Sequence, residues 1–223
     1  MTRGILIAGD ESSLFAAAAA EAAKRVESFA SACIPNRLQI AGGPPPKTEL
    51  PAGAISLSWN PASPISARTM VLAAENRLGQ INDAILVCSP PALFKGAEVP
   101  APEEIEIFSN EHIKGWFFII RELFQYFRRS YSGTLSFVIP EIIPHGKNVP
   151  VDLLGPAAIE SFRGFARGIL AMSANERFPA MGFTCPAACS ETEFASWLFK
   201  TIDEGARKMT GRWKKYPKFK FLR

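Results

Sequence analysis

The stretch that decides the fold is Gly4-Ile-Leu-Ile-Ala-Gly9-Asp-Glu-Ser-Ser-Leu-Phe15, which is followed by an alanine-rich run that extends to Ala23. Residues 5–8 form a short apolar segment, which is typical of a strand buried in a parallel sheet. The residues after Gly9 predict a tight turn, and the alanine run favours a helix that begins near residue 12. The stretch therefore predicts a strand, a turn and a helix in direct succession.

This arrangement resembles the dinucleotide-binding loop of the Rossmann fold, in which glycines let the backbone approach a pyrophosphate at the helix N-terminus. Gly9 matches the first of these glycines, whereas Ser13 and Phe15 stand at the other two positions. We expect the Phe15 ring to fill the space that phosphates would use, unless it turns away from the loop. The frame of the fold is retained, and the chemistry of the loop is altered.

Length and composition favour one soluble domain over residues 1–223 and a cytoplasmic location. No apolar run approaches the ~20 residues of a membrane span, and Asp10 and Glu11 interrupt the N-terminal apolar segment before a signal-peptide core could form. The four cysteines are scattered, and Cys185 and Cys189 lack the CxxC spacing of a zinc knuckle. We therefore expect a reducing compartment and no metal site.

The net charge of +4 is unevenly distributed, because residues 207–223 contain eight basic and no acidic side chains. The rest of the chain has 17 basic and 21 acidic residues. Lysine and phenylalanine alternate at the end of this basic tail, which favours an edge strand with one exposed face. Two other interpretations stay open, docking on an acidic partner and, least favoured, binding of single-stranded nucleic acid.

Apolar segments of strand length alternate with helical patterns along the chain. The expected strands are residues 5–8, 37–41, 54–58, 84–87, 134–139 and 181–185, and the expected helices are residues 12–30, 66–79, 103–130 and 156–178. Short apolar strands between helices are typical of a parallel sheet that is covered on both faces. We predict an α/β fold with a doubly wound parallel sheet of the Rossmann type, in three α/β/α layers.

Five segments, in order and spacing, resemble those of the short-chain dehydrogenase/reductase family. The segments are Asn76-Arg-Leu-Gly79-Gln-Ile81-Asn-Asp83-Ala-Ile85-Leu86-Val87, Ile113-Lys-Gly115-Trp-Phe117, Gly133-Thr-Leu-Ser-Phe-Val138, Arg163-Gly-Phe-Ala-Arg167-Gly-Ile-Leu-Ala171 and the stretch from Glu193 to Gly211. Together they extend over nearly the whole chain. The resemblance implies the family's fold, with a seventh strand in the basic tail.

The resemblance also implies hydride transfer between a nicotinamide and a carbonyl or alcohol, for which the family uses Tyr, Lys, Ser and Asn. At the matching positions this chain has Gly155, Ile159, Pro140 and His112, respectively. The first three side chains cannot transfer a proton, and residues 132–215 contain no tyrosine. We therefore assign no catalytic residue and expect a degenerate active site.

The residues that select the nucleotide in this family are replaced as well. Gly42 and Gly43 follow the expected second strand, where the family has Asp or Arg, and Ser58 stands where its Asp contacts the adenine. We assign Gly9 and Ser12 to nucleotide binding. No cofactor is expected, and NAD(P) is the candidate if one binds.

Three further side chains of the long helix over residues 103–130 have a catalytic interpretation. His112 could act as an acid or base, but a histidine at a helix start without an identifiable carboxylate partner is more often a surface or capping residue. Tyr126 and Tyr131 lie past the middle of the helix, where aromatic side chains usually pack. We interpret both tyrosines as structural.

The same helix has apolar side chains around almost its whole circumference, whereas a helix on a sheet needs one apolar stripe. We expect an exposed ridge of Trp116, Phe117, Ile120 and Phe124 that a partner covers. In the resembled family, this helix and the next one form a four-helix bundle across a two-fold axis. The expected interface is residues 103–130 and 156–173, and the alternative is burial within one subunit.

These observations predict a catalytically degenerate protein that acts as a non-catalytic subunit or scaffold. It would form a homo-oligomer, or a hetero-oligomer with an active short-chain dehydrogenase. The first alternative is an atypical NAD(P)-dependent oxidoreductase that uses His112 or a cofactor-only mechanism. The second is a regulatory module that senses a nucleotide through the altered loop.

Overall fold

The computed structural model describes residues 3–35, 49–93, 100–142, 152–205, 208 and 210–217. Its strands are β1 (Ile5–Asp10), β2 (Phe29–Ile34), β3 (Ala54–Ser56), β4 (Asp83–Val87), β5 (Thr134–Pro140), β6 (Ala180–Cys185) and β7 (Arg212–Lys215). Its helices are α1 (Ser13–Ala23), α2 (Pro64–Leu78), α3 (Pro102–Ser109), the π-helix η1 (Asn110–Lys114), α4 (Gly115–Ser130), α5 (Leu154–Ser173) and α6 (Glu191–Gly205).

The strands form a seven-stranded parallel sheet in the order β3-β2-β1-β4-β5-β6-β7. From β1 the chain proceeds outward to β3, returns to β4 on the other side of β1, and then proceeds outward to β7. The strand order therefore reverses between β1 and β4, and in such sheets ligands bind beyond the carboxyl ends of the strands at this reversal. This topology confirms the predicted doubly wound fold.

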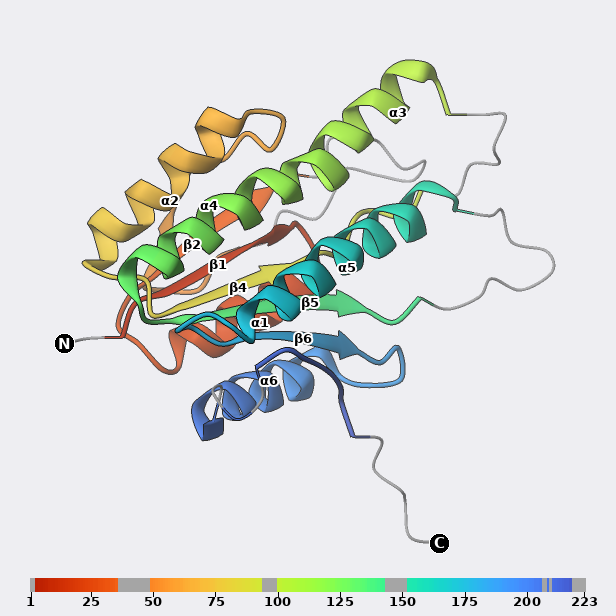
Figure 1. The fold of residues 1–223 in the computed structure, drawn as a ribbon. Helices are drawn as coiled ribbons and strands as arrows, with labels where there is room; N and C mark the ends of the chain where they lie inside the picture. The colour runs from red at the N-terminus through yellow and green to blue at the C-terminus, as the bar shows by residue number, and fades with distance from the viewer. Residues whose placement is uncertain are drawn as a thin grey trace, which may run out of the picture.

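Helices cover both faces of the sheet, so the predicted three layers are confirmed. Figure 1 shows α2, α4 and α5 over one face, and α1 and α6 over the other. Side chains of β1 alternate between the layers, because Leu6 and Ala8 pack beneath α2 and α4 while Ile5 and Ile7 pack against α1 and α6. In the described part of the chain, no helix combines the length and the apolar composition needed to cross a membrane.

The second strand lies earlier in the chain than predicted. α1 ends at Ala23, and the backbone N–H groups of Arg25 and Val26 both donate to the carbonyl of Ala22. Residues 29–34 then form β2, so the predicted helix over residues 12–30 is wrong at its end. Parallel pairing with β1 overrides the helix preference of the alanine-rich sequence. The predicted strand at residues 37–41 falls outside the described residues.

The predicted long helix is present as α3, η1 and α4 in direct succession. The backbone N–H of Gly115 donates to the carbonyl of Asn110, a bond that is characteristic of a π-turn. The next helix, α5, ends at Ser173 rather than at residue 178.

Most of the apolar circumference of α4 is buried within the chain itself. Trp116 is fully buried, with ring centroids 5.6 Å from Trp59 and 4.8 Å from Phe162 of α5. Ile120 and Phe124 are buried too, whereas Phe117 is 51 % exposed. The prediction of an exposed four-residue ridge is therefore wrong, because α2 and α5 flank α4 on both sides.

The edge-strand interpretation of the basic tail is confirmed for β7. Residues Arg212–Lys215 pair in parallel with β6 at the end of the sheet. The Trp213 ring lies against Gly182 of β6, where a Cβ would overlap it, and its Nε1–H donates to Thr184 Oγ1 at 2.8 Å. The alternating Lys and Phe residues 218–221 lie outside the described residues.

The interpretation of Tyr126 as structural leads to a stability prediction. Its hydroxyl accepts a hydrogen bond from the buried backbone N–H of Ile81 at 2.9 Å. Tyr126→Phe leaves that N–H without a partner, so we expect the free energy of unfolding in denaturant to fall by about 1–3 kcal/mol. Tyr131→Phe is the control, because Tyr131 is exposed and its loss should change stability by less than about 0.5 kcal/mol. Equal stability of Tyr126→Phe and the unmodified chain would contradict the buried bond.

Candidate functional site

The loop between β1 and α1 lies where the strand order reverses, at the carboxyl edge of the sheet. Ser12 is the N-cap of α1, and its Oγ accepts a hydrogen bond from the backbone N–H of Phe15 at 3.2 Å. The Ser13 hydroxyl donates to Glu191 Oε1 of α6 at 2.8 Å. Both serine side chains at the start of α1 are therefore bonded within the chain.

The Phe15 ring turns away from the loop and is fully buried in the core between the sheet, α1 and α6. A Cβ on Gly9 would lie 2.7 Å from Phe15 Cδ2 and 2.7 Å from the carbonyl oxygen of Val87. The main expectation, that the ring fills the phosphate space, is wrong. The exception, that the ring turns away from the loop, is confirmed, because the Phe15 ring lies against β1, where Gly9 leaves room for it.

Carboxylates surround the N-terminus of α1. Asp10 and Glu11 precede the helix, and Glu191 approaches its first turn through Ser13. The pKa of the nearby Cys33 thiol is raised to about 12, chiefly by burial and then by the charges of Glu11 and Asp10. A phosphate group placed at this N-terminus would therefore face like charges, which oppose the attraction of the helix dipole.

Asp10 and His112 form the polar centre of the site. The Nδ1–H of His112 donates to Asp10 Oδ1 at 2.8 Å, and the side chains are 2 % and 1 % exposed, respectively. The other Asp10 oxygen, Oδ2, accepts a hydrogen bond from the backbone N–H of Ser89 at 2.7 Å. Asp10 therefore connects the loop after β1 with the loop after β4 and with η1.

The surroundings of this pair are largely apolar. The Phe108 ring lies 4.6 Å from the His112 ring, and Cys88 beside Asp10 is fully buried. Burial raises the pKa of the Cys88 thiol well above its ordinary value, and the negative charge of Asp10 raises it further. Cys88 is therefore a neutral thiol rather than a nucleophile.

The structure corrects the sequence interpretation of His112. His112 lies in the π-turn in the middle of the long helix rather than at a helix start, and it has a carboxylate partner. It is therefore neither a surface nor a capping residue. Sequence reasoning missed Asp10 as this partner, although a carboxylate at the end of the first strand is itself a signal for the site.

The structure describes all three positions at which the family's proton-transferring side chains are replaced in the sequence. Pro140 ends β5, Gly155 is the second residue of α5, and Ile159 is buried one turn later. Asp152 Oδ1 accepts hydrogen bonds from the backbone N–H groups of Leu154 and Gly155 at 3.1 and 3.0 Å. A Cβ at Gly155 would overlap this buried carboxylate, so a larger side chain there displaces the group that caps α5.

The position at which the sequence analysis expects a nucleotide-selecting residue also shifts. Since β2 ends at Ile34, the residue that follows it is Pro35, not Gly42 or Gly43, which lie outside the described residues. Ser58 follows β3 and is exposed. Gly9 lies within β1 and Ser12 caps α1, so the two residues assigned to a nucleotide both have structural roles. Within the described ranges, no three His, Cys, Asp or Glu side chains gather as metal ligands would.

Comparisons with known proteins show the fold. No protein-family model matches the chain, and no curated protein matches its sequence. The structure is similar to a 3-ketoacyl-(acyl-carrier-protein) reductase from Brucella melitensis complexed with NADH, with a TM-score of 0.75 and 13 % identity over 96 % of each chain. It is also similar to NADH-dependent reductase A1-R′ complexed with NAD, with a TM-score of 0.72 and 11 % identity over 96 % of this chain and 95 % of that one. For a short chain dehydrogenase from Mycobacterium smegmatis the TM-score is 0.70, with 12 % identity over 98 % of this chain and 94 % of that one.

The buried pair generates a second prediction, tested by a double-mutant cycle of Asp10→Ala and His112→Ala. We expect a coupling energy of about 0.5–3 kcal/mol, measured by denaturant unfolding, because the two groups are in direct contact. Asp10→Ala should cost more than His112→Ala, since it also leaves the Ser89 N–H without its acceptor. The control cycle uses Lys200 and Glu204, an exposed pair on α6 whose coupling should not exceed about 0.5 kcal/mol. Additive effects of the two buried substitutions would rule out the contact.

Proposed function

We propose, from the premise that the chain has the fold of the short-chain dehydrogenases/reductases, that it is a catalytically degenerate protein and works as a non-catalytic subunit. The observation that supports this most is the buried contact between Asp10 and His112. It lies at the strand-order reversal, where proteins with this type of sheet bind their ligands. In this chain, the Asp10 and His112 side chains lie at that point and are bonded to each other.

The charges and the bonded side chains at the start of α1 oppose the binding of a dinucleotide. NAD and NADH are present in two of the similar structures, and their pyrophosphates are anionic. Here Asp10, Glu11 and Glu191 lie around the N-terminus of α1, while the Ser12 side chain already caps it. The site therefore disfavours a dinucleotide through like charges as well as through altered loop residues.

The chain also lacks the side chains that a reductase requires at these positions. Proton transfer to a carbonyl needs a side chain with a mobile proton within reach of the substrate. Pro140, Gly155 and Ile159 have none, and His112 is 2 % exposed with its Nδ1 bonded to Asp10. The alternative of an atypical oxidoreductase that uses His112 requires this pair to separate. The alternative of a nucleotide sensor requires binding at the acidic loop.

The proposed assembly surface is the outer face of α4 and α5. Phe117 contacts Phe165 of α5 edge to face, with ring centroids 5.6 Å apart, and remains 51 % exposed, and Met172 is exposed further along α5. Nothing lies within 4 Å of a Cβ built at Gly164 or Gly168, so the backbone of α5 is open to a close neighbour. A second copy, or an active enzyme of the same fold, could pack two helices against this surface.

The third prediction concerns the cofactor. Titration calorimetry with NADH and with NADPH should show no saturable binding to the purified chain, and NADH oxidation with ketone and aldehyde substrates should stay at background. The Brucella reductase serves as the positive control, since its structure contains NADH. A low-micromolar dissociation constant for either nucleotide would contradict the proposal. It would favour the sensor if turnover were absent, and the oxidoreductase if turnover were present.

The fourth prediction concerns assembly. Light scattering of the full chain should give twice the mass of 24.3 kDa. Phe117→Asp combined with Met172→Asp should dissociate the dimer, because charges would be buried without partners in an apolar contact. Phe117→Leu with Met172→Leu is the matched control and should preserve it. A folded monomer of the unmodified chain at micromolar concentrations would exclude self-association.

A further inference from the structure

A cavity lies at the carboxyl end of the sheet, between α5 and the last two strands, β6 and β7. Its volume is about 380 Å³, which is within the range of small-molecule sites. Side chains of α5, the ends of β6 and β7 and the two residues that follow β5 line it. Strands β4 and β5 separate β6 from β1, so the cavity is distinct from the contact between Asp10 and His112.

The indole of Trp213 forms the base of this cavity. Trp213 of β7 is paired with Gly182 of β6, and its ring occupies the space that a side chain at Gly182 would fill. On α5, the guanidinium carbon of Arg163 lies over the ring, 5.9 Å from its centroid. The contact between the cation and the indole therefore holds Arg163 at the wall of the cavity.

Arg163 has a buried hydrogen-bond donor without an acceptor. Its Nη1 lies 2.7 Å from Glu160 Oε1, one turn earlier on α5. Its Nε is buried and makes no hydrogen bond within the described part of the chain. The Nε edge of a guanidinium binds the oxygens of a carboxylate or a phosphate in a planar, two-pronged arrangement. Because a buried donor without an acceptor is costly, this edge indicates a ligand that supplies acceptors.

Thr184 has a second donor that the described residues do not use. The residue is 6 % exposed, and its Oγ1 accepts a hydrogen bond from the indole N–H of Trp213 at 2.8 Å. A threonine hydroxyl can also donate one hydrogen bond, and among the described residues no acceptor bonds this hydrogen. Since Thr184 lines the cavity, its hydroxyl can donate to a group that enters it.

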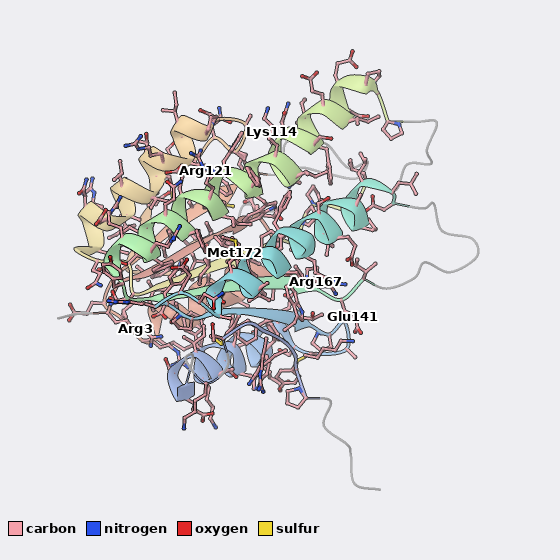
Figure 2. All side chains as sticks on the ribbon, viewed as in Figure 1. Arg3, Lys114, Arg121, Glu141, Arg167 and Met172 are labelled. Carbon is pink, nitrogen blue, oxygen red and sulfur yellow. The ribbon has the colours of Figure 1, made fainter. Side chains whose placement is uncertain are left out.

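Two further cations border the cavity. Arg167, which Figure 2 shows on α5, lies one turn after Arg163, and Lys215 is the last residue of β7. Both are exposed, and neither forms an ion pair within the described ranges. Cations around the mouth of a cavity attract anions and raise their local concentration.

The two carboxylates that line the cavity are already bonded within the chain. Glu160 is paired with Arg163. Glu141, which Figure 2 shows just beyond β5, accepts a hydrogen bond from the backbone N–H of Ala187 at 3.3 Å. Of the three cations and two carboxylates, one pair is neutralised, and two cations and one carboxylate are left. The balance of charge therefore favours an anionic ligand.

We propose that this cavity binds a small organic anion through a carboxylate or phosphate group of the ligand. The Nε–H of Arg163 and the hydroxyl of Thr184 donate to the anionic oxygens, while Arg167 and Lys215 attract the charge. The volume of about 380 Å³ exceeds what such a group alone would fill. The carbon skeleton of the ligand occupies the remaining space, beside the half-buried Ile142.

This inference goes beyond the proposed function, because it holds whether the chain is a monomer or a subunit. It also gives the first part of the basic tail a role, since Trp213 and Lys215 both lie in β7.

The test follows the indole N–H signals of the full chain by NMR during titration with sodium phosphate and, separately, with sodium acetate. Sodium chloride keeps the ionic strength constant. The Trp213 signal is identified as the one that is absent from Trp213→Phe. We expect it to shift saturably with at least one probe while the signals of the other three tryptophans stay in place. The probe with the lower dissociation constant identifies the anionic group as phosphate or carboxylate.

Arg163→Lys keeps the positive charge but removes the Nε edge. We expect the dissociation constant to rise roughly tenfold or more, because a hydrogen bond to a charged group is lost. Arg128→Lys is the matched control and should bind as the unmodified chain does, since Arg128 is also paired with a glutamate, Glu176, and also lies over an aromatic ring, that of Phe124. Circular dichroism would verify that the variants are folded.

A second variant, Arg167→Gln with Lys215→Gln, changes two exposed residues only and should weaken binding, because the attracting charges are lost. A Trp213 signal that does not saturate with either probe, or that shifts equally with added chloride, would overturn the proposal. Equal dissociation constants for the unmodified chain, Arg163→Lys and the Arg167–Lys215 variant would overturn it as well.

Discussion

The missing side chain at Gly9 is the constraint on which the α1 side of the molecule depends. Without it, the Phe15 ring packs against β1 and fixes the distance between α1 and the sheet. α1 in turn packs against α6, so this close contact helps to position the layer of helices on that face. Glycines in a dinucleotide-binding loop bring the helix close for a phosphate. Here the close approach of α1 to the sheet instead brings the buried Phe15 ring against β1.

The sequence predicts the fold well where tertiary and local preferences agree. Ala84–Val87 is continuously apolar between polar turns, which suits a strand buried on both faces, and it lies within β4 (Asp83–Val87). Residues 29–34 give no such signal, because small and polar residues follow an alanine-rich helix without a glycine or proline to end it. Pairing with β1 makes this segment a strand, and the local sequence pattern does not predict that pairing.

The candidate site is harder to predict, because its parts are distant in the sequence. Asp10 and His112 are separated by 102 residues, and no local spacing relates them. Asp152 lies three residues before Gly155, so its capping role could be predicted from the preference for aspartate at helix starts. Trp116 lies in a helix with an apolar pattern, which predicts that its side chain is buried. Whether neighbouring helices or a partner supply the contact depends on how α2 and α5 flank α4.

Because η1 is a π-turn, the position of His112 depends on the number of residues in that turn. A π-turn holds one residue more than an α-turn between its bonded groups, here Asn110 and Gly115. Removing one residue from this turn would rotate all of α3 by about 100° relative to α4, since an α-helix has 3.6 residues per turn. Phe108 would then leave its buried position, and the histidine would leave Asp10. A substitution leaves the length of this turn unchanged, whereas the loss of one codon would shift α3 relative to α4 in a single event.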